Sequence, residues 1–215
     1  MDILQSVLRT LERERVIAIL RTDDPARAGE AAEAAIAGGL RVIEFTMGIP
    51  NAIDLVRAFS GRESIVVGVG TVLHEEEARA AIDAGARFLV SPVLDTQLLS
   101  FVQDRGILMI PGVATPTEIW QAIRVGARVV KVFPQPSGGP EWIRAIRGPM
   151  PFVRMIPTHG VTVDNILDYL AAGAFAVGMT RTLFHPEDMA HGRWSRITAR
   201  ARVVVDRIRR YRRGS

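Results

Sequence analysis

A fourfold internal repeat constrains the fold of this 215-residue chain more than any other feature. Each copy reads as the end of a helix, a glycine-containing turn and a β-rich run, and glycine is favoured in such a turn because it adopts a left-handed backbone at little cost. The turn glycines of the four copies are Gly39, Gly85, Gly126 and Gly173. They lie 46, 41 and 47 residues apart, whereas one strand, its helix and their loops need about half of such an interval. Each interval therefore predicts a second strand.

Four further strand-like runs stand where the repeat requires them. They begin at Val16, Ser64, Ile107 and Val153, and each precedes a polar or Gly/Pro turn and a helical stretch. The eight runs are mostly apolar throughout, which is typical of strands covered on both faces. A solenoid suits repeats at this spacing, and an open doubly wound sheet suits the strand–helix alternation. The pattern favours a third architecture, the α/β fold of a (β/α)8 TIM barrel.

Two terminal segments complete the predicted barrel. An extra N-terminal helix from Ile3 to Arg15 precedes the first strand, and we expect it to cap the barrel bottom. A last helix, from about Pro186 to Arg210, is expected to close the outer ring. The chain has no low-complexity linker, and a hydrophobic content of 48% is enough for one sizeable core. Residues 1–215 are therefore expected to form a single domain.

Composition excludes several classes of protein. No run approaches the roughly eighteen apolar residues of a membrane span, and the charged N-terminus does not fit a secretory signal, so we expect a cytoplasmic protein without membrane contact. The absence of cysteine excludes disulfides and thiolate metal sites. The net charge is +4, and five arginines lie between positions 207 and 213. We interpret this basic end as a solvated helix end and frayed tail, because no nucleic-acid motif accompanies it.

Lys131 is the one lysine of the chain, although lysine and arginine together number 27. Because nearly all basic positions are arginine, the one lysine is expected at a position whose function arginine cannot perform. Schiff-base formation is such a role, because guanidinium stays protonated and does not form the imine. Chance is the alternative explanation. However, Lys131 lies inside the apolar run VVKVFP, where a charge needs a partner or a function.

Glu44 interrupts a second apolar run, IEFTM, on the second predicted strand. Lys131 falls on the sixth strand, which lies opposite the second in an eight-stranded barrel, and barrel active sites lie at the C-terminal strand ends. We therefore expect Glu44 and Lys131 to meet across the barrel mouth. A buried ion pair that only fills the centre is the alternative, although such pairs contribute little to stability. In the functional interpretation, Lys131 is the nucleophile and Glu44 moves protons during carbon–carbon cleavage.

Seven motifs carry a resemblance to a known family. In order along the chain they are VIAILR, GGLRVIEFTM, VVGVGTVL, FLVSPVLD, IPGVATPTE, KVFP and PTHGVTVDNI. Together they make the chain, from about Val16 to Phe184, closely similar to the KDPG/KHG aldolases (2-keto-3-deoxy-6-phosphogluconate and 4-hydroxy-2-oxoglutarate aldolases). The resemblance implies Lys131 as the Schiff-base lysine and Glu44 as the general acid/base. It also implies a homotrimer that needs no metal and no cofactor.

The resemblance extends to residues that would contact the substrate. It implies that Thr71 lies beside the pyruvyl carboxylate, that Pro92 and Phe133 shape the pocket, and that Thr158 contacts the substrate. Some members carry an arginine just after the E-x-T segment of the second strand, where it binds the carboxylate. That place is Gly48 here. Arg21, at the end of the first strand, is expected to supply the guanidinium instead, because arginine suits carboxylates bidentately.

Two further departures fall where the family binds phosphate. Family members usually have Gly-Gly after Pro-Thr on the seventh strand and Gly-Ser at the end of the eighth, and these present backbone amides to phosphate. The pairs here are His159-Gly160 and Thr180-Arg181. Three interpretations stay open: anion binding by Arg181 and a protonated His159, a changed substrate, or side chains that simply face solvent.

The resemblance implies a class I aldolase that splits a 2-keto-3-deoxy acid into pyruvate and an aldehyde. The expected substrate is 2-keto-3-deoxy-6-phosphogluconate (KDPG), which yields glyceraldehyde 3-phosphate. The alternatives within this class are 4-hydroxy-2-oxoglutarate (KHG) and an unphosphorylated 2-keto-3-deoxy acid. Outside it, an isomerase or synthase on the same barrel and a non-catalytic ligand-binding barrel with an altered phosphate site are further alternatives.

Overall fold

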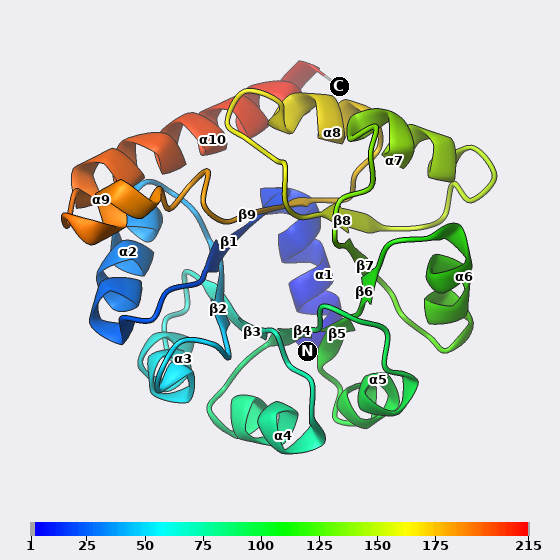
Figure 1. The fold of residues 1–215 in the computed structure, drawn as a ribbon, viewed down its shortest axis with the longest axis horizontal. Coiled ribbons are helices and arrows are strands. Elements are labelled where there is room, and N and C mark those ends of the chain that lie inside the picture. Colours follow the sequence, from blue (N-terminus) through cyan, green and yellow to red (C-terminus); the bar gives the residue numbers. More distant parts are fainter. Residues whose placement is uncertain (1–2, 215) are drawn as a thin grey trace.

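The computed structural model describes residues 3–214, and it shows a ring of parallel strands enclosed by a ring of helices (Figure 1). The strands are β1 (Val16–Leu20), β2 (Val42–Thr46), β3 (Val66–Gly70), β4 (Phe88–Val90), β5 (Leu108–Ile110), β6 (Gly112–Val113), β7 (Val130–Val132), β8 (Met155–Pro157) and β9 (Val177–Met179). The helices are α1 (Ile3–Glu14), α2 (Pro25–Ala37), α3 (Ala52–Ser60), α4 (Glu75–Asp83), α5 (Thr96–Gln103), α6 (Pro116–Arg124), α7 (Pro140–Arg147), α8 (Ile166–Ala171), α9 (Pro186–Ala190) and α10 (Trp194–Gly214). This is the α/β barrel that the repeat predicted.

The strands pair as one sheet in the order β5-β4-β3-β2-β1-β9 and a second in the order β6-β7-β8. β5 and β6 belong to one run of chain interrupted at Pro111, which has no N–H to donate to a ladder. Before the proline the chain pairs with β4, and after it with β7. At the other joint, a parallel bridge between Thr158 and Gly178 links β8 to β9. The fifth predicted strand is thus bent into two pieces, and counting it once restores the expected eight.

The repeat glycines adopt the conformation that their position predicted. Their φ angles lie between 94° and 103°, in the left-handed region that disfavours a side chain. Each also donates its N–H to the carbonyl oxygen three residues back, at 2.9 to 3.0 Å. The four are Gly39, Gly85, Gly126 and Gly173. The same tight turn therefore connects a helix to the following strand in each copy.

Helix α1 closes the bottom of the barrel, as expected. Its residues Val7, Leu8 and Leu11 are buried in one apolar cluster with Val42 and Phe175, which lie at the N-terminal ends of β2 and β9. In Figure 1 the helix is seen inside the ring of strands. The opposite end of the barrel, at the C-terminal ends of the strands, is where the polar side chains lie.

The expectation of one helix from about Pro186 to Arg210 is wrong. The chain forms two helices, α9 and α10, because it turns at Gly192, whose φ is +61°. The prediction of a frayed C-terminal tail is also wrong, because α10 continues to Gly214. Two of its arginines are docked: Arg207 donates to the carbonyl oxygen of Val163, and Arg212 to that of Arg13.

Residues 3–214 offer neither a membrane span nor a clustered metal site. No helix there has the length and apolar character needed to cross a membrane. No group of three or more histidine, aspartate or glutamate side chains is arranged to hold a metal ion.

Candidate active site

Glu44 and Lys131 are charged residues buried inside the barrel. Glu44 lies in the middle of β2 and is 1% exposed, while Lys131 lies in the middle of β7 and is 8% exposed. β2 and β7 stand on opposite sides of the ring (Figure 1). Their charges nevertheless interact, because the ammonium of Lys131 acts on the pKa of Glu44. The two side chains thus lie within electrostatic reach of each other, although no hydrogen bond joins them, and their joint role in a site stays a prediction.

The carboxylate of Glu44 has no hydrogen-bond partner among the described residues, although both oxygens are buried. Burial raises the pKa of Glu44 above its usual range, and the positive charge of Lys131 lowers it by a smaller amount. A structural carboxylate at such depth would normally accept hydrogen bonds, because leaving its oxygens unpaired is costly. The group is therefore kept in a state that favours taking up a proton.

Space for this carboxylate is provided by Gly70, the last residue of β3. A Cβ atom placed on Gly70 would lie 1.8 Å from Oε1 of Glu44, so no other residue is accommodated there without moving the carboxylate. The next residue, Thr71, has a φ of +61°, which is unusual for a β-branched side chain. Strained backbone of this kind is concentrated at functional sites. The end of β3 is thus shaped around Glu44.

Lys131 is connected to the open end of the barrel through Phe133. Its Nζ lies 5.1 Å from the centre of the Phe133 ring, and Phe133 lines a cleft of about 530 Å³. We call this the main cleft. Its lining residues are Ile19, Arg21, Phe133, Pro134, Thr158, His159, Thr180, Arg181 and Phe184. Six of the residues predicted for the site, namely Arg21, Phe133, Thr158, His159, Thr180 and Arg181, therefore lie around one cleft.

A second cleft of about 380 Å³, here called the side cleft, adjoins the first. Arg21, Arg181 and Phe184 line both clefts, and the side cleft also contains Arg27 and Asp24. Arg27 pairs with Asp24 at 3.1 Å. Arg21 and Arg181 make no ion pair with any residue that the structure describes, and both are exposed. Two unpaired guanidinium groups thus border the main cleft on its outer side.

Five of the predicted residues do not line the main cleft: Glu44 and Lys131, which lie deeper in the barrel, and Thr71, Pro92 and Gly160. Thr71 follows Gly70 directly after the end of β3. Pro92 follows β4, and its backbone packs against Gly112, the register partner of Lys131. Gly160 follows His159 but lies behind it, near the Tyr169 hydroxyl and the side chain of Gln135.

The loop after β8 explains how His159 stands where the family pattern has glycine. His159 has a φ of +76° and Gly160 one of +79°, so two successive residues are left-handed. Such a conformation favours glycine, and at His159 it costs free energy, about 1–3 kcal/mol for a strained residue of this kind. Asn165 fixes the loop, because its side-chain amide donates to the carbonyl oxygen of Gly160 at 2.9 Å and its Oδ1 accepts from Thr162. The histidine side chain is exposed at the cleft rim.

Thr158 is buried against Gly178 of β9. A Cβ atom on Gly178 would lie 2.5 Å from Oγ1 of Thr158, so the glycine admits the threonine side chain between the two strands. Thr158 is thereby held by packing. Its hydroxyl makes one long hydrogen bond, of 3.5 Å, to Ile156.

Several residues of the site escaped prediction from the sequence. Ile19, Pro134 and Phe184 line the main cleft, and as ordinary apolar residues near strand ends they carry no sequence signal. Gln135 is different, because its amide nitrogen and oxygen are buried with no hydrogen-bond partner in the described chain. Its position directly after the VVKVFP run is a signal that could have identified it.

A family model described as "KDPG and KHG aldolase" matches residues 7–200. The chain is 37% identical over 209 residues to a 2-dehydro-3-deoxy-phosphogluconate aldolase of Pseudomonas aeruginosa, which covers 95% of this chain and 94% of the relative. It is 35% identical to the KHG/KDPG aldolase of Escherichia coli K12, covering 81% of this chain and 83% of the relative. Among solved structures, the KDPG aldolase of Legionella pneumophila, with pyruvate captured at low pH as a covalent carbinolamine intermediate, superposes with a TM-score of 0.84 at 30% identity. That superposition covers 92% of this chain and 97% of the other.

Proposed function

The chain belongs to the KDPG and KHG aldolase family, and from that premise we propose that it cleaves KDPG to pyruvate and glyceraldehyde 3-phosphate through a Schiff base at Lys131. Membership makes it a carbon–carbon lyase of the class I aldolase type. The observation that carries the residue assignment is the buried pair of Glu44 and Lys131. A buried carboxylate without hydrogen bonds, within electrostatic reach of the one lysine, is suited to proton transfer and poorly suited to a structural role.

The reaction begins with imine formation. The Nζ of Lys131 attacks the C2 carbonyl of the keto acid to give a carbinolamine, and protonation of its hydroxyl lets water leave, so that an iminium ion forms. Glu44 is the group at hand to deliver that proton, because burial raises its pKa and it is protonated more readily than an exposed glutamate. The carbinolamine that the Legionella aldolase forms with pyruvate supports this step.

Cleavage follows in the same place. The C4 hydroxyl loses its proton to the Glu44 carboxylate, directly or through a water molecule, and the C3–C4 bond breaks with its electrons moving to the iminium. The products are an enamine on Lys131 and a free aldehyde. Return of the proton to C3 and addition of water then release pyruvate and the free amine. The electron sink is the substrate's own imine, so the proposal includes no cofactor.

The far end of the substrate is assigned to the outer side of the main cleft. Arg181 is positively charged there, and His159 lines the same cleft. Arg21 was expected at the pyruvyl carboxylate, but we assign it to the far end because it lines both clefts together with Arg181. A guanidinium suits both a phosphate and a carboxylate, so the distal phosphate of KDPG and the second carboxylate of KHG are both compatible. The Escherichia coli relative is named for both substrates. KDPG is our first choice because the Pseudomonas aeruginosa relative is named for it alone.

Four wider properties belong to the same proposal. We infer a homotrimer working in the cytoplasm within the Entner–Doudoroff route, with neither nucleic acid nor membrane as a partner. The resemblance of the seven motifs supports the trimer. Light scattering of the purified protein tests the assembly, and a molar mass of one or two chains would contradict it.

Borohydride trapping with pyruvate tests the chemistry directly. We expect a reduced three-carbon adduct on Lys131, located by peptide mass spectrometry. Because the chain has one lysine, the α-amino group is the only other primary amine that borohydride can fix. Lys131→Met should abolish the adduct and the cleavage of KDPG. Full cleavage by Lys131→Met would overturn the proposal.

A further inference from the structure

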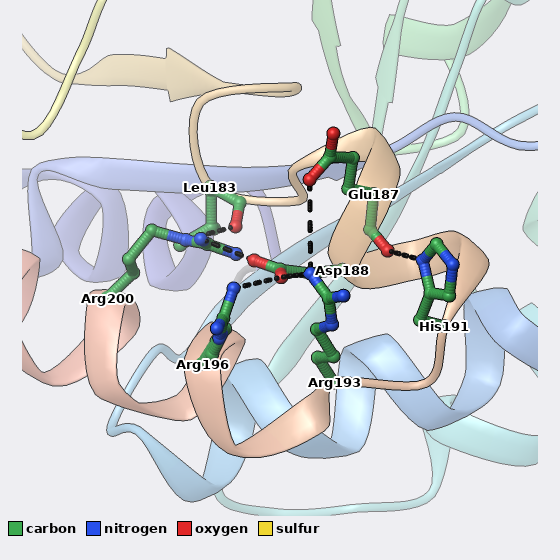
Figure 2. Close-up of polar contacts among 7 residues, drawn as sticks. All are labelled: Leu183, Glu187, Asp188, His191, Arg193, Arg196 and Arg200. Atoms are coloured by element: carbon green, nitrogen blue, oxygen red, sulfur yellow. Dashed lines mark hydrogen bonds and ion pairs between the residues drawn. The ribbon is translucent and has the colours of Figure 1, made fainter.

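A charged cluster joins the last two helices next to the site (Figure 2). Its centre is Asp188 of α9, which is 3% exposed. Three arginines around the start of α10 surround this carboxylate: Arg200 at 2.7 Å, Arg196 at 3.4 Å and Arg193 at 3.7 Å. We call these four residues the Asp188 cluster. Asp188 is therefore an almost completely buried carboxylate on a helix that borders the side cleft.

Arg200 reaches beyond the cluster to the loop after β9. Its Nη1 donates to Oδ2 of Asp188 at 2.7 Å, and its Nε donates to the carbonyl oxygen of Leu183 at 3.0 Å. Figure 2 shows the guanidinium between these two acceptors. Its third nitrogen, Nη2, is buried with no partner among the described residues. These two contacts fix the position of the Arg200 side chain, which thereby connects α10 to the loop after β9.

The loop that Arg200 holds is part of the main cleft. Leu183 and Phe184 both donate their N–H groups to the carbonyl oxygen of Thr180, at 3.0 and 2.8 Å, which makes a compact turn. Arg181 and Phe184 of this turn line both clefts. On its other side the turn is tied to the loop after β8, because Thr182 donates to the carbonyl oxygen of Val161 at 2.8 Å.

The cluster keeps its charge under ordinary conditions. Burial raises the pKa of Asp188, but hydrogen bonds and positive charge from Arg200 and Arg196 outweigh it, and the net pKa lies below its usual value. The carboxylate is therefore ionised at neutral pH. Since Arg193 and Arg196 already pair with Asp188, α9 and α10 would stay joined without Arg200. What only Arg200 adds is the bond to Leu183.

We propose that Arg200, oriented by Asp188, is a positioning residue that fixes the turn bearing Arg181 and thereby sets the affinity for the anionic far end of the substrate. This role rests on the proposed function, because it presupposes that the main cleft receives that end. Arg200 itself does not line either cleft, so its effect passes through Leu183. Chemistry at Lys131 does not depend on this turn.

The test compares Arg200→Gln with Arg212→Gln. Both arginines belong to α10 and both donate to a backbone carbonyl, but Arg212 contacts Arg13 of α1, a helix that closes the opposite end of the barrel. Three quantities are measured: the KM and kcat for KDPG, the rate of borohydride trapping with pyruvate, and the inhibition constant of inorganic phosphate. Arg200→Lys serves as a milder variant, because it keeps a charge for Asp188 and loses the forked contact.

For Arg200→Gln we expect KM and the phosphate inhibition constant to rise roughly tenfold, with kcat and pyruvate trapping within about twofold of the parent. Arg200→Lys should shift KM in the same direction by less, and Arg212→Gln should leave it unchanged. Equal KM values in Arg200→Gln and Arg212→Gln would overturn the positioning role, as would a fall in trapping that parallels the rise in KM. If Arg200→Gln does not fold, Arg200→Lys decides by the same criteria. Failure of the unaltered protein to trap pyruvate would instead overturn the proposed function.

Discussion

The two ends of the site are built differently. At the inner end, Glu44 and Lys131 are buried in strands, and the carboxylate fits a space that only glycine leaves open at Gly70. At the outer end, Arg181 and His159 are exposed on loops and held by a few hydrogen bonds between loop segments. Residues in strands have little freedom to move, whereas loops are more mobile and tolerate changes.

This difference separates the reaction from the selection of substrate. At the inner end, Glu44 and Lys131 keep the family pattern and carry the bond-breaking chemistry common to the class, although Gly48 departs from that pattern. All the departures at the far end, His159, Thr180 and Arg181, fall on the outer loops. The contrast predicts large effects on kcat from substitutions at the inner end, and smaller effects, confined to KM, from those at the outer end.

The strongest way to break the comparison is to replace Lys131 by arginine. Lys131→Arg keeps a positive charge near Glu44, yet guanidinium does not form an imine, so kcat should fall by about 10⁴-fold or more. Steady-state kinetics with KDPG measures this, and circular dichroism checks that the barrel is intact. Activity within tenfold of the parent would show that the charge, and not the imine, is what the site uses.

Glu44→Gln should lower kcat by about 10²- to 10⁴-fold, because the amide is nearly isosteric but does not transfer protons. The same change should raise the melting temperature at pH 7. Burial raises the pKa of Glu44, so folding favours the protonated form, and stability is lost as the pH rises from the unfolded pKa through the folded one. The neutral amide escapes this loss. A lower melting temperature at neutral pH would mean that the attraction between the Glu44 carboxylate and the charge of Lys131 stabilises the barrel.

Gly70→Ala probes the inner end without touching a reacting group. The added Cβ would overlap Oε1 of Glu44, and a carboxylate displaced by about 1 Å should cost roughly 10²-fold in kcat. Gly61→Ala, after the end of α3, is a matched control, because nothing lies within 4 Å of the Cβ that it would add. The kcat values of the two variants are compared under the same conditions. Equal kcat values would show that the space at Gly70 is not needed for catalysis.

Arg181→Gln should have the smallest effect and the most selective one. Loss of one charge-assisted hydrogen bond at an exposed position should raise the KM for KDPG roughly tenfold and leave kcat nearly unchanged. The KM for an unphosphorylated 2-keto-3-deoxy acid should not change. An equal rise for both substrates would place Arg181 outside the binding of the phosphate, and would favour a changed substrate.

Much of the inner end could be predicted because its charged residues interrupt apolar segments of the sequence. A glutamate in IEFTM and a lysine in VVKVFP are visible as charges in apolar runs, and strand counting places them opposite each other. Gly70 and Gln135 were not predicted, because a glycine at a strand end and a glutamine in a loop are common. Their roles become visible only in three dimensions. Gly70 lies against the carboxylate of Glu44, and the buried amide of Gln135 has no hydrogen-bond partner in the described chain.

The sequence by itself determined the eightfold strand count, the left-handed turns at the four repeat glycines and the placement of Glu44 and Lys131 on opposite strands, because each depends on local pattern and period. Tertiary structure alone decided that α9 and α10 are separate, that Arg21 and Arg181 border the same clefts, and that Arg200 connects α10 to Leu183 and Asp188. These features join side chains from distant parts of the chain. Their distances depend on how the ring closes and how the loops pack, which no local pattern encodes.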